Sequence, residues 1–271
     1  MTRASRSKLL LLAGALVAML VVGVGTGTSK TTAPKRGGDM VIMAGSNLPS
    51  WDPATAPNTI PGVQSDRFNA LYGNLVWTDS KGQLQPGMAQ SLTTKDFLTW
   101  TLKLRPGLKF TSGNAYNAAA VKANWDRIAA PGSGGVSQLF ASQFQTKVED
   151  ATTLTCTLQR KDPSFALRIA ELLAYIADPA SLPAIGKPYT SPVGAGPFKF
   201  DSQVPGVSET VVRNPGYWEK NRPYLDKITR DHKTIFALCE NVGQIEGRAD
   251  DALESGLLAL RLLLREGRVD T

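Results

Sequence analysis

Alternating apolar and polar positions predict the strands of this chain. Trp100, Leu102 and Leu104 alternate with Thr101, Lys103 and Arg105, a pattern that places one face of a strand inside and the other in water. The run "TTLTCTLQR" repeats the pattern at 152–160. The stretch 197–213 predicts a hairpin, since two strand-like runs flank the turn "VPG". The apolar run 39–45 predicts a short buried strand.

Three other segments show the apolar spacing of helices. They are marked by Phe68, Leu71 and Leu75, by Val121, Trp125 and Ile128, and by Phe165, Ile169, Leu172, Leu173 and Ile176. Asn117 is the expected N-cap of the second helix. Asp162 is the expected cap of the third, with Pro163 at its first position. Because strands and helices mix without a strict βαβ alternation, we predict a mixed α/β (α+β) fold.

Two polar stretches are predicted as connections. Residues 46–62 hold four prolines and predict an ordered loop, because proline cannot sit inside a helix without breaking it. Residues 81–92, "KGQLQPGMAQSL", predict a turn-rich link.

The N-terminal segment has the layout of an export signal. Basic residues come first, an uninterrupted apolar run fills 9–24, and small residues fill 25–29. We therefore expect a signal peptide at 1–30 and a polar linker at 31–38. An uncleaved membrane anchor is the alternative, since no charge occurs from 9 to 29. Either case predicts an exported protein on the outer side of the cytoplasmic membrane.

The charge of the chain argues against a nucleic-acid partner. The 271 residues include 30 basic and 23 acidic ones, for a formal net charge of +7. Four basic residues and no acidic residue lie in the first 30, so the remainder carries only three more basic than acidic residues. Such a small excess gives no nucleic-acid footprint.

Candidate catalytic and metal-binding groups are few. The single histidine, His232, falls in an irregular stretch and is expected to be a solvated surface residue. Cys156 should face the core, and a disulfide with Cys239 is allowed but not placed by the sequence. No metal-ligand spacing, phosphate loop or GxSxG motif is present, so we expect no metal, no cofactor and no enzyme. An exported hydrolase with scattered acids is a weaker alternative.

The five tryptophans divide into two groups. Trp100 and Trp125 fall on predicted core faces. Trp51, Trp77 and Trp218 lie in or beside loops, where an indole either covers a ligand or plugs the core. We expect plugs, the commoner role.

Five ordered segments together resemble the extracellular solute-binding proteins, family 5, of ABC importers, which include dipeptide-, oligopeptide- and nickel-binding types. The segments are "SWDPATA", "GMAQSLTTKDFLTWTLKLRPGLKFTSGNAYNAAAVKANWDRI", "VEDATTLTCTLQRKDPSF", "SPVGAGPFKF" and "NPGYWEKNRPYLDKI". By this resemblance the last run is a structural clasp that holds aromatic rings, Trp218 among them, against the sheet.

The resemblance implies a type II periplasmic-binding-protein fold. Residues 39–228 would form the N-terminal lobe with the small inserted domain, and the second lobe would be missing. The tail 229–271 departs from the family pattern and is interpreted as a frameshift or premature end, with a genuine replacement helix as the alternative.

The resemblance also implies a function and a site. The expected function is binding of a small peptide or similar solute, by a monomer that delivers it to a membrane permease. A remnant that folds without binding is the alternative, and nickel chelates or sugars stay open as solutes. By position in the family pattern, Thr55, Asn58, Thr59 and Phe140 would contact the ligand.

Overall fold

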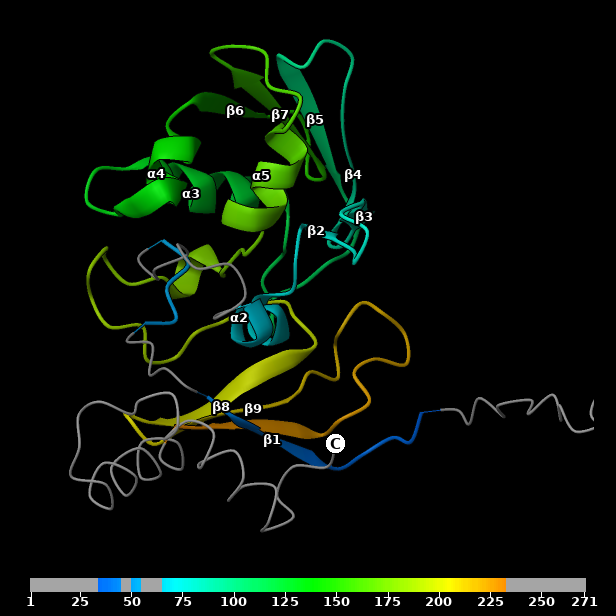
Figure 1. Cartoon of the computed structure of the whole chain (residues 1–271), viewed down its shortest axis with the longest axis vertical. Helices are drawn as coiled ribbons and strands as arrows, with labels where there is room; N and C mark the ends of the chain where they lie inside the picture. The colour runs from blue at the N-terminus through cyan, green and yellow to red at the C-terminus, as the bar shows by residue number, and fades with distance from the viewer. Residues whose placement is uncertain (1–33, 45–49, 55–64, 233–271) are drawn as a thin grey trace, which may run out of the picture. The chain divides into compact units, whose positions relative to one another are not determined.

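The fold is built on two four-stranded sheets in the computed structural model (Figure 1). The structure describes residues 34–44, 50–54 and 65–232. The first sheet has the strand order β1-β10-β9-β8. Its strands are β1 (Asp39–Met43), β8 (Phe198–Val204), β9 (Ser208–Arg213) and β10 (Lys227–Asp231). β1 and β10 pair in parallel, whereas the other two pairings are antiparallel. The first sheet thus joins the start of the described chain to its end.

The second sheet is antiparallel and has the order β4-β5-β7-β6. Its strands are β4 (Ala89–Thr94), β5 (Thr99–Leu104), β6 (Phe144–Val148) and β7 (Thr153–Leu158). Three helices gather on one of its faces in Figure 1: α3 (Ala118–Ala129), α4 (Gly135–Ala141) and α5 (Phe165–Leu172).

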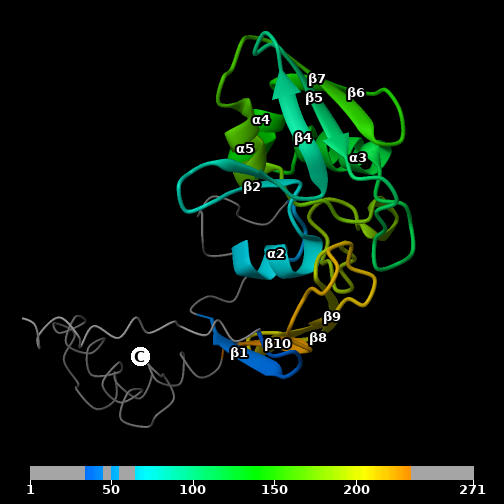
Figure 2. The same ribbon diagram turned by 90° about the vertical axis from the view of Figure 1, so that its right-hand side faces the viewer.

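Smaller elements connect the two sheets. The helix α2 (Ser65–Tyr72) packs against β8 of the first sheet, as Figure 2 shows. The short strands β2 (Val76–Thr78) and β3 (Leu84–Pro86) pair as a ribbon that contacts α5. A 3-10 turn follows at Pro179–Ser181.

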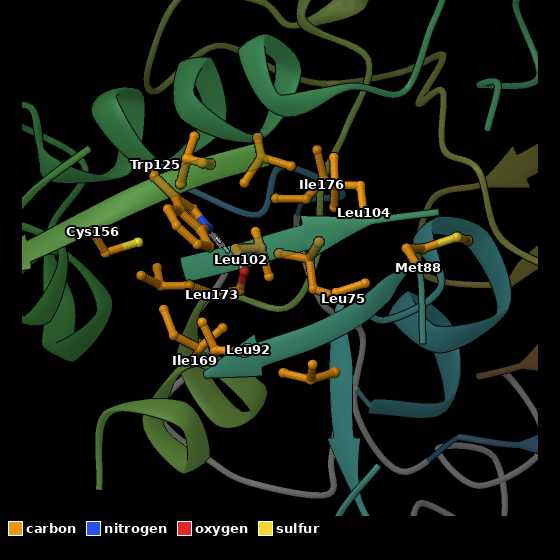
Figure 3. Close-up of a cluster of buried hydrophobic side chains, with 14 of the residues drawn as sticks. Leu75, Met88, Leu92, Leu102, Leu104, Trp125, Cys156, Ile169, Leu173 and Ile176 are labelled. Carbon is orange, nitrogen blue, oxygen red and sulfur yellow. Dashed lines mark hydrogen bonds between the residues drawn. The ribbon is translucent and has the colours of Figure 1, made fainter. Parts of the chain in front are cut away.

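The apolar core lies between the second sheet and its helices (Figure 3). We use this name for the cluster that includes Leu102, Trp125, Cys156, Ile169 and Leu173, all at most 1% exposed. The indole nitrogen of Trp125 donates a hydrogen bond to the Leu173 carbonyl at 3.0 Å, so the one polar atom of this ring is satisfied. Burial raises the pKa of the Cys156 thiol to about 12, which keeps it protonated and unreactive.

The strongest sequence patterns are confirmed. β5 alternates as predicted, with Trp100, Leu102 and Leu104 buried. Asn117 caps α3, because its side-chain oxygen accepts a hydrogen bond from the Ala120 amide at 2.9 Å. The predicted hairpin is β8–β9, and the mixed α/β class is also confirmed.

Several local features differ from the predictions. The run 81–92 is not only a link, because it contains β3 and the start of β4. β6 was not predicted, since its burial follows no clean alternation. α5 begins at Phe165, so Pro163 precedes it and Asp162 bonds Ser164 instead of serving as the N-cap.

A further error concerns β1, which was predicted to be buried and is not. Met40 and Val41 are 46% and 65% exposed. Within the described ranges β1 lies at the edge of its sheet and pairs only with β10, so an apolar run here did not mean a covered strand.

The loop tryptophans differ from one another. Trp51 is a plug, at 2% exposed, whereas Trp77 is 43% exposed. Trp218 is half-buried against the apolar core, with the Arg105 guanidinium 4.2 Å from its ring centroid. The expected clasp is therefore present but covers its indole only in part.

His232 contradicts its prediction, because it is 1% exposed rather than solvated. The stretch before it is not irregular either: β10 runs past Ile228 to Asp231, and the His232 amide donates to the Val207 carbonyl at 2.8 Å.

The expected leader (1–30), the first part of the expected linker (31–33), Cys239 and most of the tail lie outside the described residues. The rest of the linker (34–38) is described, and the Gly37 amide donates to the Tyr224 carbonyl at 2.8 Å. Of the helices that are described, none has the length and apolarity to cross a membrane.

Candidate functional site

The carboxyl ends of the parallel strands β1 and β10 define the edge at which the site is built. The Ala44 amide donates to the Asp231 carbonyl at 2.9 Å, so the two strands stay paired to their last residues. In open α/β sheets, ligands bind in the crevice outside the carboxyl ends of parallel strands, and β1 and β10 are the parallel pair of this mixed sheet. The segment Ser50–Ala54 follows β1 in the chain, and its Trp51 lines a small cavity together with Ile42 of β1 and Arg230 of β10.

Trp51 holds this segment to the first sheet. Its indole nitrogen donates to the Gln203 side chain at 3.0 Å, and its carbonyl accepts from the Tyr72 hydroxyl. The ring meets Phe200 edge to face, with centroids 5.6 Å apart. Burial raises the pKa of Tyr72 well above its ordinary value, so the hydroxyl stays protonated as a donor.

Asp52 ties the same segment to helix α3. Both of its carboxylate oxygens accept from the Arg127 guanidinium at 2.6 Å, in a fork that fixes orientation as well as distance. Arg127 also donates to the Pro183 carbonyl at 2.9 Å. Asp52 in turn accepts from the Ala54 amide at 2.9 Å and closes a tight turn. The loop therefore presents a fixed backbone.

Behind Trp51 lies the charged core, by which we mean Arg67, Glu209 and Arg230. The Arg67 guanidinium stacks 3.7 Å from the centroid of the Trp51 ring and pairs with Glu209 at 2.9 Å. Arg230 approaches the other Glu209 oxygen at 3.6 Å. All three residues are at most 7% exposed.

Burial governs the proton affinities of the charged core. Burial lowers the pKa of Arg67 to about 10, although the Glu209 carboxylate opposes the shift. Burial also raises the pKa of Glu209 above its ordinary value, and the two arginines offset this only in part. Such a cluster costs desolvation free energy but fixes one arrangement of its members.

A small cavity of about 90 Å³ adjoins the charged core. Its walls combine apolar side chains, Ile42 and Ile228 among them, with Asp66 and the charged core. A space of this size with several polar partners suits ordered water better than a solute.

The predicted ligand contacts fall in different places. Thr55, Asn58 and Thr59 lie outside the described residues, directly after the anchored Ser50–Ala54 segment. Phe140 lies on α4 and is 2% exposed, packed against Phe144 and Phe165. It belongs to the apolar core, and none of the residues that contact its ring belongs to the Trp51 segment. The ligand role of all four residues stays a prediction.

Several positioning residues were not singled out from the sequence. Arg67 lies four residues before Leu71, on the apolar stripe of α2, and Glu209 shares the buried face of β9 with Val211. A charge at an apolar position was the available signal for both residues. Nothing local marked Arg127 as the partner of Asp52, 75 residues away.

Ion pairs hold the Ser50–Ala54 segment in place. Asp52 pairs with Arg127, and Arg67, which stacks on Trp51, pairs with Glu209. Across the described ranges, no set of three or more His, Cys, Asp or Glu side chains is placed to hold a metal ion.

Comparison with known proteins identifies the family. Residues 83–232 match the profile of "Bacterial extracellular solute-binding proteins, family 5 Middle". The glutathione-binding protein GsiB of Escherichia coli (strain K12) is 34% identical over 194 residues, which cover 70% of this chain and 37% of that protein. The GsiB of Shigella flexneri is also 34% identical over 194 residues. The match thus spans well under half of these relatives.

Solved structures of similar fold agree. The oligopeptide-binding protein AppA of Bacillus subtilis, in complex with a nonapeptide, is 22% identical with a TM-score of 0.64, over 78% of this chain and 44% of that one. The murein tripeptide binding protein MppA of Escherichia coli is 25% identical with a TM-score of 0.61, over 73% and 42%. The predicted likeness to type II periplasmic binding proteins is confirmed for the part that matches.

The family profile covers the whole second sheet together with β8, β9 and β10. The anchored Trp51 segment precedes this match, and its Arg127 anchor lies inside it. The chain belongs to the bacterial extracellular solute-binding proteins of family 5.

Proposed function

We propose that this chain forms one wall of a solute-binding protein that takes a peptide-class solute outside the cytoplasmic membrane and delivers it to an ABC permease. The observation that carries the proposal is the anchored Ser50–Ala54 segment at the carboxyl edge of β1 and β10. Members of family 5 are periplasmic or extracellular, which fits the expected export signal.

A fixed loop at this edge suits an extended ligand. Peptides that bind along an exposed backbone gain hydrogen bonds to main-chain groups, and side-chain pockets then give specificity. The Asp52–Arg127 fork and the Trp51 contacts order the loop before any ligand arrives, so binding does not bear that ordering cost. We propose that Thr55, Asn58 and Thr59, which follow directly, present the contacting groups.

Several of the relatives support a peptide as the solute. The names of GsiB, AppA and MppA refer to glutathione, an oligopeptide and a murein tripeptide. Each of these ligands contains amino acids joined by amide bonds. We therefore propose a short peptide and a monomeric binding protein without catalytic turnover.

The 271-residue chain on its own should bind weakly. Its match covers 37% of the GsiB length, and a single wall leaves a ligand half in water. Association costs several kcal/mol whatever the number of contacts. We expect a dissociation constant above about 10 μM, equivalent to roughly −7 kcal/mol.

Nuclear magnetic resonance titration tests the proposal in this weak range. Glutathione or trialanine added to the labelled chain should shift the backbone amides of Ser50, Trp51, Asp52 and Ala54, whereas maltose at the same concentration should not. Arg127→Lys, which keeps the charge but loses the fork, should reduce the shifts. Arg222→Lys is the matched control, because Arg222 is exposed and its ion pair is with Glu219, three residues away.

The contrary outcomes are equally specific. Shifts confined to other regions would overturn the assignment of the site, and a response to maltose alone would overturn the peptide class. Peptide cleavage, detected by chromatography of the same samples, would contradict a binding role. The absence of shifts with every solute at millimolar concentration would favour the non-binding remnant.

A further inference from the structure

A second hollow, of about 280 Å³, lies at one end of the second sheet, where α4 and α5 meet β6 and β7. The residues that line it all fall between Phe140 and Arg168. None of them belongs to the first sheet or to the Trp51 segment. The hollow is therefore separate from the edge of β1 and β10.

The floor of the hollow is aromatic. Phe140, Phe144 and Phe165 form a three-ring cluster with centroids 5.1 to 5.6 Å apart. Phe144 and Leu158, each 8% exposed, provide its most accessible apolar edge. A floor of this kind favours a flat or short apolar group over a hydrated one.

The rim of the hollow is basic. Arg160 and Lys161 are exposed, and Arg168 pairs with Asp162 at 3.1 Å while it lies 4.1 Å from the Phe140 centroid. The three cations outnumber the single acid of the lining. Among the described residues no ion pair involves Arg160, so its guanidinium is available to a ligand.

The neighbouring hairpin adds an unusual aromatic residue. Phe97 has a φ of 60°, a conformation that costs free energy for a bulky side chain and usually falls to glycine. Its ring is nevertheless 46% exposed, and its carbonyl accepts from the Asp162 amide at 2.9 Å. This exposed ring on a strained backbone, next to the rim, adds an apolar group to the surface around the hollow.

We propose that this hollow is a second binding site, for a small molecule that joins a carboxylate to an aromatic or short alkyl body. The body would lie over the Phe144 and Leu158 edge, and the carboxylate would meet Arg160, with Arg168 held in place by Asp162. Arginine suits this role, because its planar fork matches the two oxygens of a carboxylate. The volume fits a molecule of one ring rather than a peptide.

The probe is 3-phenylpropionate, with 3-phenylpropanamide as a neutral match of the same shape. Titration of the labelled full chain should give saturable shifts of amides between 140 and 168, with a dissociation constant below about 1 mM. The amide should bind at least about tenfold more weakly, because it offers no charge to the rim.

Two variants complete the test. Arg160→Gln should weaken phenylpropionate at least about fivefold, since it removes the unpaired guanidinium. Lys95→Gln is the matched control: it removes an equal charge from the nearby hairpin and should leave the affinity within about twofold. Both side chains are exposed, so both variants should fold.

Three results would overturn the site: equal binding of acid and amide, shifts that do not saturate, or equal effects of the two variants. The peptide titration reports on 50–54 and this one on 140–168, so failure of one proposal does not imply failure of the other.

Discussion

The apolar core and the charged core belong to two different sheets of one chain and use burial in opposite ways. In the apolar core, Trp125 and Leu102 exclude water, and the one indole donor is satisfied. In the charged core, Arg67 and Glu209 are buried just as deeply but meet as ions. Apolar burial stabilises directly, whereas a buried ion pair costs about as much as it returns.

The difference suggests that the two cores have different roles. The apolar core supports the second sheet, and the helices on this sheet pack against it through a shared apolar face. The charged core lies under Trp51, where a stacked guanidinium fixes one position of the indole. We infer that the first sheet gives up some stability to orient the loop at its edge, and the following substitutions test this contrast.

The largest effect is expected from Trp125→Ala. The change removes a fully buried indole and its hydrogen bond to Leu173, and it should lower the free energy of unfolding by about 3–5 kcal/mol. Urea denaturation followed by circular dichroism measures the loss.

Two other tryptophans calibrate that result. Trp77→Ala should cost less than about 1 kcal/mol, because its ring is 43% exposed. Trp218→Ala should fall between the other two, since Trp218 is half-buried. Equal losses at all three positions would mean that burial does not control stability in this region.

Glu209→Gln probes the charged core. It removes the carboxylate that lies between two buried arginines, of which Arg230 also pairs with Asp66 at 3.4 Å. The change should cost about 3 kcal/mol in the same denaturation assay.

A triple variant separates the free energy lost when one ion pair of the charged core is broken from the net contribution of the intact charged core to stability. Arg67→Met, Glu209→Leu and Arg230→Met together should change stability by less than about 1 kcal/mol, since apolar groups of similar size replace all three ions. The same variant should alter Trp51 fluorescence, because the stacked cation is lost. A triple variant as unstable as Glu209→Gln would refute the inference that the first sheet gives up stability to orient the loop.

Arg127→Lys tests the anchor between the two regions. The lysine keeps the charge but cannot form the fork with Asp52, so we expect a loss of about 2 kcal/mol in urea denaturation. Faster exchange of the Ala54 amide should accompany it, as Asp52 holds that amide. Unchanged exchange would show that the turn does not need the fork.

The smallest effect is a pH dependence in the β4–β5 hairpin. The amides of Thr99 and Leu98 donate to Asp96 and lower the pKa of its carboxyl. A depressed folded-state pKa contributes stability above the unfolded value, about 3.9, and that stability is lost as the pH falls through the folded value. Thermal melts of Asp96→Asn and the unchanged chain should therefore differ slightly at pH 7 and converge once the pH has fallen through the folded-state pKa of Asp96. A constant difference would exclude the carboxylate as the cause.

The sequence by itself determined the features that arise from near neighbours. The alternation in β5, the apolar stripe of α3 and the Asn117 cap are set within a few residues, so their pattern was sufficient. The order of five motifs also indicated the family, because the order and spacing of motifs can be seen in the sequence without a structure. The same local reasoning failed at β1, where burial depends on what covers a sheet edge.

Only the tertiary structure decided which distant residues meet. The parallel pairing of β1 with β10 joins segments at opposite ends of the described chain, and Asp52 meets Arg127 across 75 residues. The burial of Glu209 between Arg67 and Arg230 likewise joins one helix and two strands. From the sequence alone, a charged residue is expected at the surface. It can be buried when a partner from elsewhere in the chain compensates the cost of burial, and that partner is set by the packing of whole elements rather than by local sequence.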